Sequence, residues 1–191
     1  MKETSAVCHA LLQTPAFFAL LRRIDEDLMK VARDRGCCHC GSALHSANYP
    51  RKPRGCPPAA RPDCETRLSL CCAECRRRTA PSSVRFLGRR VWLAITLVLR
   101  SSGTHGACLD GLPAIGWATL KRWRQWWTET FPNTPTGRWL RGLIPPTPEP
   151  LIYPDCLLQS VQRDSEEKRL AAVLRLLLGP GLTTLAEGCA R

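Results

Sequence analysis

The stretches Cys37-Cys38-His39-Cys40-Gly41 and Cys71-Cys72-Ala73-Glu74-Cys75 decide the fold of this chain. Each contains a Cys-x-x-Cys pair, Cys37 with Cys40 and Cys72 with Cys75. A two-residue spacer lets both sulfurs of a pair face one ion, and four thiolates complete a closed tetrahedral Zn²⁺ site. Gly41 suits the positive φ that such a turn often requires. The sequence therefore predicts a zinc ribbon whose strands are separated by a Pro- and Arg-rich arm, residues 41–66.

The identity of the four ligands stays open, because other possible ligands lie one residue away from the predicted ones. Cys38, His39 or Cys71 would replace an adjacent ligand, and Cys56 with Cys64 are weaker candidates for a second metal. A disulfide scaffold is disfavoured because cysteine accounts for 12 of 191 residues, below the usual density of such scaffolds. A redox or iron–sulfur centre is the other interpretation, although a redox Cys-x-x-Cys normally occurs once and in a βαβ context.

The positive charge of the chain is concentrated in one part of the sequence. The formal net charge is +12. Residues 51–100 hold 12 basic and 3 acidic residues, whereas residues 142–191 hold 5 basic and 6 acidic residues. A focused basic region indicates a polyanionic partner, most simply DNA or RNA. The plainer interpretation is a solvated surface that only maintains solubility.

No segment is expected to cross a membrane or to direct export. The most apolar stretch, 91–99, is too short to span a bilayer. The apolar run 16–21 ends at Arg22-Arg23 and is followed by no small-residue cleavage site, so we expect no signal peptide. Cysteines that look unpaired then favour the reducing cytoplasm.

A long helix is predicted from Thr14-Pro15, the cap and first helical position, to Gly36, which can end it. The apolar positions that recur at helical spacing are Phe17, Leu20, Leu21, Ile24, Leu28 and Val31. The positions expected on the polar face are Arg22, Arg23, Asp25, Glu26 and Asp27.

The arm and the second cysteine pair carry the first set of candidate phosphate-binding cations. Prolines hold the arm extended and project Arg51, Lys52 and Arg54. Residues 67–70 alternate and predict a strand leading into the second pair. Arg76, Arg77 and Arg78 follow the last ligand; they suit phosphate, and they also offset the charge of a zinc–thiolate centre. Arg89 and Arg90 begin a helix predicted over 89–100.

A helix-turn-helix is predicted downstream, from a short helix at 107–112, a turn at 113–116 and a basic helix at 117–127. In the last helix Leu120, Trp123 and Trp127 form an apolar seam, so its aromatic residues are expected in the core. The residues off the seam, which suit the major groove of DNA, are Thr119, Lys121, Arg122, Arg124 and Gln125. An ordinary amphipathic helix with solvated cations is the alternative.

The complete prediction is a mainly α fold with a small β zinc ribbon, followed by a helix-turn-helix-like helical region. Its segments are an N-terminal helix (1–36), the ribbon with its arm (37–88), the helix-turn-helix-like region (89–131), a Pro-rich linker (132–154) and a C-terminal amphipathic helix (155–191). Within the last segment a helix over 155–178 has its apolar strip at Leu170, Val173, Leu174, Leu177 and Leu178. That helix either binds a partner or a second copy, or docks on its own domain.

Residues 37–95 resemble the N-terminal zinc ribbon of bacterial insertion-sequence transposases, in the two cysteine pairs, in Arg76-Arg77-Arg78 and in Trp92-Leu93-Ala94-Ile95. The segment 116–127 is similar to their helix-turn-helix. A longer resemblance, in Tyr49-Pro50-Arg51-Lys52-Pro53-Arg54-Gly55 and in 83–90, is to a family of uncharacterised bacterial proteins. The transposases cut DNA with a carboxylate trio on a separate domain. The residues after 131 offer no such trio here, so we expect no catalysis.

These expectations combine into a zinc-dependent protein that binds duplex DNA, a transposase-related regulator or accessory factor of a mobile element. It would act in the bacterial cytoplasm, at the nucleoid. The alternatives are a protein-interaction adaptor built on the ribbon and the 155–178 helix, and an RNA binder. Steep salt dependence of nucleic-acid binding would favour the DNA-binding protein over the adaptor.

Overall fold

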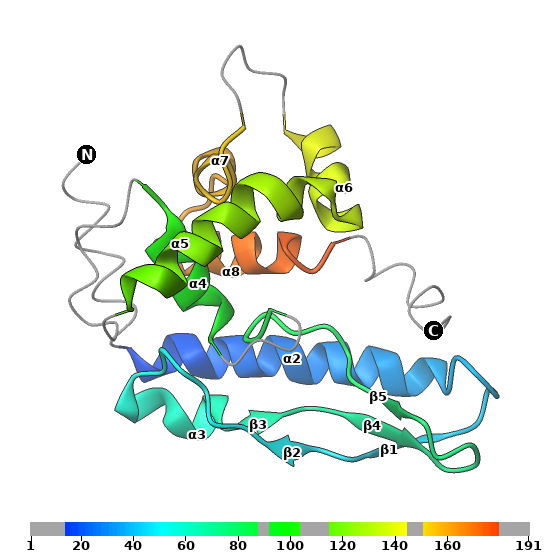
Figure 1. Ribbon diagram of the computed structural model, residues 1–191. Coiled ribbons are helices and arrows are strands. Elements are labelled where there is room, and N and C mark those ends of the chain that lie inside the picture. The colour runs from blue at the N-terminus through cyan, green and yellow to red at the C-terminus, as the bar shows by residue number, and fades with distance from the viewer. Residues whose placement is uncertain (1–13, 88–91, 104–114, 145–150, 180–191) are drawn as a thin grey trace.

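The computed structural model describes residues 14–87, 92–103, 115–144 and 151–179, and it has three layers (Figure 1). The long helix α2 (Pro15–Arg35) runs through the middle. Short strands and helix α3 (Arg61–Cys64) lie on one side of it, and helices α4 to α8 lie on the other. Short antiparallel strands and many helices confirm the mainly α class with a small β part.

Helix α2 begins at Pro15 and ends before Gly36, whose φ of 76° is the left-handed conformation that glycine tolerates. Phe17, Leu21 and Ile24 are buried as expected. The predicted faces are wrong at two positions. Asp25 is 2% exposed, because polar partners from another segment meet it, whereas Val31 is 43% exposed.

The strands are two or three residues long and form two antiparallel sheets. One sheet has the order β1 (Leu44–Ser46), β4 (Leu70–Cys72), β5 (Arg78–Thr79), and the other pairs β2 (Tyr49–Pro50) with β3 (Thr66–Arg67). The single strand predicted over 67–70 is wrong, because β3 ends at Arg67 and β4 begins at Leu70. The amide of Ser69 donates to the side chain of Asn48 at 3.0 Å, so the two sheets are joined there by a side chain.

Helix α4 (Ala94–Ser101) is shorter than the helix predicted over 89–100. Trp92 forms an isolated bridge with Arg54, and Leu93 forms one with Phe86. These residues are extended and tie the start of the helical layer to the arm and to the segment before it. Arg89 and Arg90 lie outside the described residues.

Helix α5 (Trp117–Gln125) confirms the predicted basic helix, which continues as a π-helical turn at Trp126–Thr130 and a 3-10 turn at Phe131–Asn133. Trp123 and Trp127 are buried, as the seam predicts, and Leu120 is half-buried. Trp117 differs, because it is 69% exposed. The short helix predicted over 107–112 lies outside the described residues.

The predicted linker over 132–154 is wrong in its first half. Helix α6 (Pro135–Leu143) fills it and buries Leu140 in the main core. Thr134 caps this helix by accepting a hydrogen bond from the Gly137 amide at 3.0 Å. Tyr153, near the other end of the expected linker, is also buried and lies edge-on to Phe131, with ring centroids 4.8 Å apart.

The single helix predicted over 155–178 is also wrong. It consists of α7 (Asp155–Ser160) and α8 (Glu166–Leu176), and the side chain of Ser165 caps α8. Leu170, Val173, Leu174 and Leu177 are buried in one core with the apolar residues of α2 and α4. Of the two alternatives for residues 155–178, the structure therefore shows docking on the chain's own domain. None of the helices in the described ranges is long and apolar enough to cross a membrane.

Candidate metal centre and basic surface

The first cysteine pair sits in a tight turn directly after α2. The Cys37 amide donates to the Ser42 carbonyl at 2.8 Å, and the Gly41 amide donates to the Cys37 carbonyl at 2.8 Å. Gly41 has a φ of 75°, as the sequence predicts for the residue after the pair. These bonds turn the chain so that both sulfurs of the pair face the same side.

The second pair follows the same plan at the turn between β4 and β5. The Cys72 amide donates to the Arg77 carbonyl at 2.9 Å, and Arg76 has a φ of 58°. A left-handed conformation is uncommon for a residue with a Cβ. Its position directly after Cys75 suggests that the turn is dictated by the placement of the sulfurs rather than by the preference of Arg76.

The strand register brings the two turns together. Leu44 of β1 pairs with Cys72 of β4, and the Ala73 amide donates to the Ala43 carbonyl at 3.0 Å. The Sγ atoms of Cys37 and Cys75 are 3.7 Å apart, and those of Cys40 and Cys72 are 3.4 Å apart. All four sulfurs lie within 4.8 Å of one another.

Four sulfurs at these separations fit a single tetrahedral metal ion. A zinc–sulfur bond of about 2.3 Å requires sulfurs about 3.8 Å apart, which lies between the observed 3.4 Å and the 4.8 Å limit. The cluster divides the candidate ligands into two groups. Cys37, Cys40, Cys72 and Cys75 form it, and Cys38, His39 and Cys71 do not. Cys56 and Cys64 belong to the main core instead.

The surroundings of Cys40 and Cys75 differ, and the pKa values of these two thiols diverge accordingly. Hydrogen bonds from the side chain and the amide of Ser42, with a further one from Cys72, lower the pKa of Cys40 to about 6. The Arg77 amide lowers the pKa of Cys75, but desolvation and the other three cysteines outweigh it and raise that pKa to about 12. These two thiols thus differ in how readily they ionise, and a bound divalent cation would favour the thiolate form of both.

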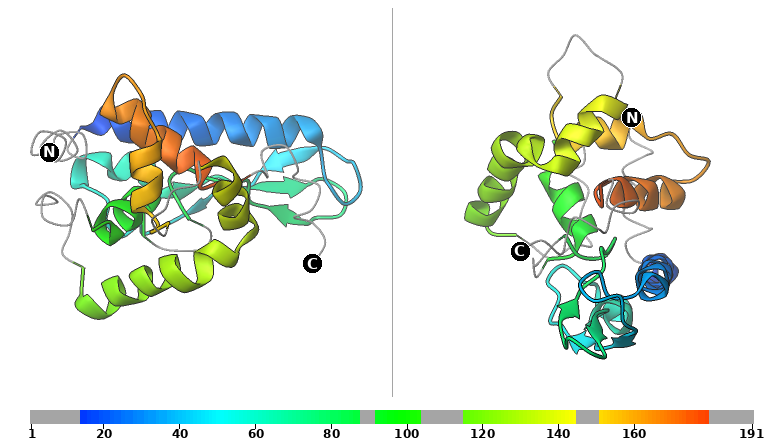
Figure 2. Two further views of the ribbon diagram at one scale, coloured as in Figure 1. Left: turned by 90° about the horizontal axis from the view of Figure 1, so that it is seen from above. Right: turned by 90° about the vertical axis from the view of Figure 1, so that its right-hand side faces the viewer.

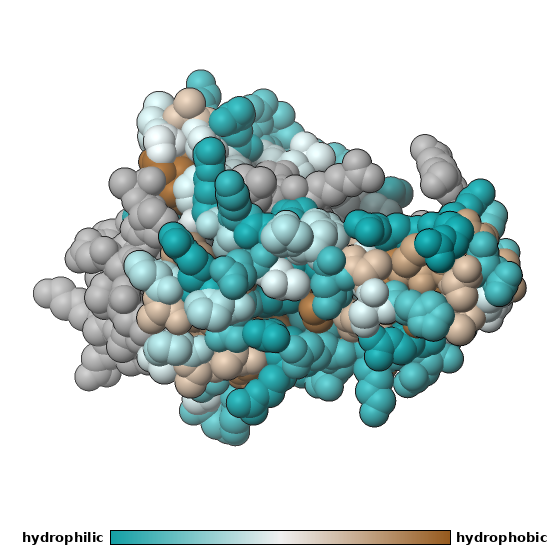
Figure 3. Space-filling view, turned by 90° about the horizontal axis from the view of Figure 1, so that it is seen from below, coloured by the Kyte–Doolittle hydropathy of each residue, from teal (hydrophilic) through white to brown (hydrophobic). Residues whose placement is uncertain are grey.

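The predicted DNA-contacting residues fall into three groups. Those that are exposed are Lys52, Arg54, Arg76, Arg77, Arg78, Lys121, Arg122, Arg124 and Gln125. Arg51 and Thr119 are half-buried. Arg89 and Arg90 lie outside the described residues. Figure 3, which views the strand layer from below, shows hydrophilic side chains over most of the described surface and smaller apolar areas between them.

The expectation that Arg51 projects freely from the arm is wrong. Its guanidinium carbon lies 6.0 Å from the centroid of the Tyr49 ring and 5.3 Å from that of Phe86. Its amide donates to the Glu65 carbonyl at 2.5 Å. Arg51 therefore fixes the arm against the strand layer through both its backbone and its side chain.

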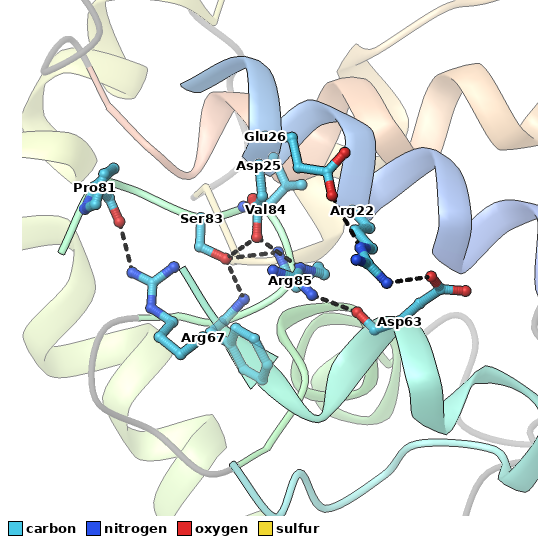
Figure 4. Close-up of polar contacts among 10 residues, drawn as sticks. Arg22, Asp25, Glu26, Asp63, Arg67, Pro81, Ser83, Val84 and Arg85 are labelled. Atoms are coloured by element: carbon cyan, nitrogen blue, oxygen red, sulfur yellow. Dashed lines mark hydrogen bonds and ion pairs between the residues drawn. The ribbon is translucent and has the colours of Figure 1, made fainter. Parts of the chain in front are cut away.

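A buried polar network around Asp25 was not predicted from the sequence (Figure 4). Asp25 of α2 accepts hydrogen bonds from the Ser83 hydroxyl at 2.5 Å, the Val84 amide at 2.7 Å and Nε of Arg85 at 2.7 Å. Arg85 also donates to the Asp63 carbonyl in α3. Both side chains of the ion pair are at most 2% exposed. The network positions the segment between the metal centre and α4, and its only sequence signal is a carboxylate next to the apolar face of α2.

Comparison of the chain with protein-family models, with curated proteins and with solved structures gave no match in any of the three. The resemblance to insertion-sequence transposases therefore stays an expectation. What can be concluded about chemistry comes from the cysteine cluster and from the exposed cations.

Proposed function

We propose that the protein is a zinc-dependent DNA-binding protein without a catalytic domain, a transposase-related regulator or accessory factor. Zn²⁺ is the ion that four cysteines in two Cys-x-x-Cys turns suit best, because it accepts four thiolates in a closed tetrahedron. When bound, the ion would order the turns, and Cys37, Cys40, Cys72 and Cys75 would hold it.

The observation that carries the DNA part is a set of exposed cations that form no ion pair within the described part of the chain. Ion pairs within the described residues involve, for example, Arg22, Arg85 and Arg169. The exposed cations of the predicted set form no ion pair with a described residue; they are Lys52, Arg54, Arg76, Arg77, Arg78, Lys121, Arg122 and Arg124. Cations left without carboxylates attract phosphate, and the counterions released from DNA supply much of the affinity.

The position of α5 supports the same proposal. Trp123 and Trp127 anchor one face of the helix in the core, which leaves Lys121, Arg122 and Arg124 exposed on the remaining surface. A helix held by buried aromatic residues presents its cations on a fixed support, as a helix that enters a groove must.

Zinc content and duplex binding on one purified sample test the proposal. We expect about one zinc per chain and duplex-DNA affinity that falls steeply as the salt concentration rises. The triple substitution Arg76→Ala, Arg77→Ala and Arg78→Ala should reduce the slope of log affinity against log salt by about 3.

A matched control removes the same charge elsewhere. Arg23 and Lys30 of α2 and Arg138 of α6 are exposed and lie outside the predicted DNA-contacting set. Replacing these three with alanine should change the slope by far less. Zinc without any nucleic-acid binding would support the adaptor instead, and tighter binding to RNA than to DNA would support the RNA binder.

A further inference from the structure

The basic segments that are separate in the sequence are joined in the structure, first at Tyr49. The guanidinium carbon of Arg51 lies 6.0 Å from the centroid of its ring, and that of Arg78 lies 5.9 Å from it. One ring therefore links the arm to the turn that carries the second cysteine pair. A cation–π contact of this kind leaves the N–H groups at the edge of the exposed Arg78 guanidinium able to bind phosphate.

The arm is joined to α5 by a second aromatic contact. The Leu93 amide donates to the Arg54 carbonyl at 3.1 Å, and Trp92 forms a bridge with Arg54. The Trp92 ring in turn lies edge-on to Trp123 of α5, with centroids 5.2 Å apart and planes at 85°. The exposed Arg54 is thus connected, through Trp92 and Trp123, to the helix that carries Lys121 and Arg124.

Gly55 fixes the middle of the arm against α4. Its φ is 79°, and a Cβ there would lie 2.7 Å from the side chain of Thr96. The Thr96 hydroxyl donates to the Gly55 carbonyl at 3.0 Å. The arm is therefore held to the helical layer at Gly55 and to β5 through the contact of Tyr49 with Arg78.

The joined segments lie on one side of the molecule. In Figure 2, α2 runs along one side, and both α5 and the edge strand β5 lie toward the other. Exposed carboxylates on these segments and beside the arm are Glu65, Glu74 and Glu129. The groups 51–54, 76–78 and 121–124 hold nine cations, of which eight are exposed and Arg51 is half-buried. The cations outnumber the carboxylates, so the net charge along this side is strongly positive.

We propose that these three groups form one continuous basic row, and that a single DNA duplex lies along it and contacts both ends at once. The inference rests on the proposed function and adds how the partner is bound. The row binds DNA through phosphates and not by stacking on bases, because the rings of Tyr49 and Trp92 are half-buried and already covered by arginine or tryptophan. A duplex, with phosphates in regular series, suits such a row better than a single strand that needs free rings for stacking.

A length series tests whether one duplex spans the row. We would measure affinity by fluorescence anisotropy for duplexes from about 8 to about 30 base pairs. Because contacts at two linked ends reinforce each other, affinity should rise steeply once a duplex is long enough to reach both ends. Beyond that length it should increase only slowly, as more binding positions become available.

Two matched triple variants give the decisive reading. One replaces Arg76, Arg77 and Arg78 with alanine, and the other replaces Lys121, Arg122 and Arg124. On long duplexes each should weaken binding about tenfold or more. On duplexes too short to reach both ends, each should cost less than about threefold, since the intact end still binds. The triple variant of Arg23, Lys30 and Arg138 should have little effect at any length.

The outcomes separate this inference from the proposed function. Absence of binding to every duplex would overturn both. Binding that is independent of length, or loss at one end only, would overturn the single row and leave a DNA-binding protein. Tighter binding to single strands than to duplexes would overturn the phosphate-row geometry. All replaced side chains are exposed, and zinc content with circular dichroism confirms that each variant is folded.

Discussion

The region around the four cysteines, residues 37–80, is called the strand end here. It and the helical layer of α4 to α8 are stabilised by different interactions. Around the four cysteines the strands are two or three residues long, and the associated core consists of Met29, Ala32, Leu44, Leu68 and Leu70 with two of the cysteines. The helical layer contributes buried aromatic and aliphatic residues from α4 to α8 to a much larger core. A few aliphatic residues under such short strands are too small a core to fold alone. The comparison predicts that a metal held by the four cysteines would be needed to order the strand end and not the helical layer.

Helix α2 belongs to both regions. Phe17, Phe18 and Leu21 in its first half lie in the larger core, whereas Met29 and Ala32 in its last turns lie in the smaller one. Gly36 then passes the chain directly to the first cysteine turn. Loss of the metal should therefore loosen the end of α2 while its beginning stays packed.

Metal removal should have the largest effect. Structural zinc in small domains contributes about 10–16 kcal/mol of apparent binding energy, so Cys72→Ser should abolish stoichiometric zinc and the order of the strand end. Hydrogen exchange followed by mass spectrometry should show lost protection in 37–80 and retained protection in α8. Since the ligands must be thiolates, lowering the pH should release the ion by protonating them.

Cys71→Ser is the matched control for that experiment. Cys71 adjoins Cys72 but lies outside the cluster, and its Sγ donates to the Arg76 carbonyl at 3.5 Å. Its replacement should leave zinc content unchanged. Equal zinc loss in the two variants would show that the ligands are not those four sulfurs, and loss of protection across α8 would show that the two regions fold as one.

The Asp25–Arg85 pair should give the next largest effect, because it links the two regions. Asp25→Ala leaves a buried guanidinium without its carboxylate, which costs about 3–5 kcal/mol. Urea denaturation should record that loss. Asp27→Ala, at an exposed position on the same helix, should stay within about 0.5 kcal/mol. Equal losses in the two variants would mean that the buried pair contributes nothing particular to stability.

Local signals in the sequence are sufficient to predict the cysteine cluster. Two Cys-x-x-Cys pairs and the residue after the first one predict the cluster and the positive φ of Gly41, because the requirements of a metal turn are short-range. Thr14-Pro15 and Gly36 likewise predict the bounds of α2 within a residue. None of these features depends on the remainder of the fold.

The wrong predictions share a different cause. Asp25 is buried because Ser83 and Arg85, far along the chain, supply its partners, and a helical pattern cannot contain that information. The helix expected over 155–178 breaks at Ser165, which caps α8, although the apolar residues alone run on. The many prolines of 132–154 led to the prediction of a linker where α6 lies. Thr134-Pro135 is nevertheless the same helix start signal as Thr14-Pro15. Tertiary partners and capping residues, rather than composition, decide these segments.

The capping residue of α6 provides the smallest test, confined to the helical layer. Thr134 accepts a hydrogen bond from the Gly137 amide at 3.0 Å, so Thr134→Ala should cost about 1 kcal/mol, or about 2–4 °C in the melting temperature of a chain of this size. Thr134→Ser keeps the hydroxyl and should retain most of that stability. Zinc content should stay unchanged in both variants, because α6 contributes to the larger core alone. Lower zinc occupancy in Thr134→Ala would mean that the helical layer supports the metal centre, and the contrast between the two regions would be wrong. Equal stability of the alanine and serine variants would mean that the hydroxyl does not start this helix.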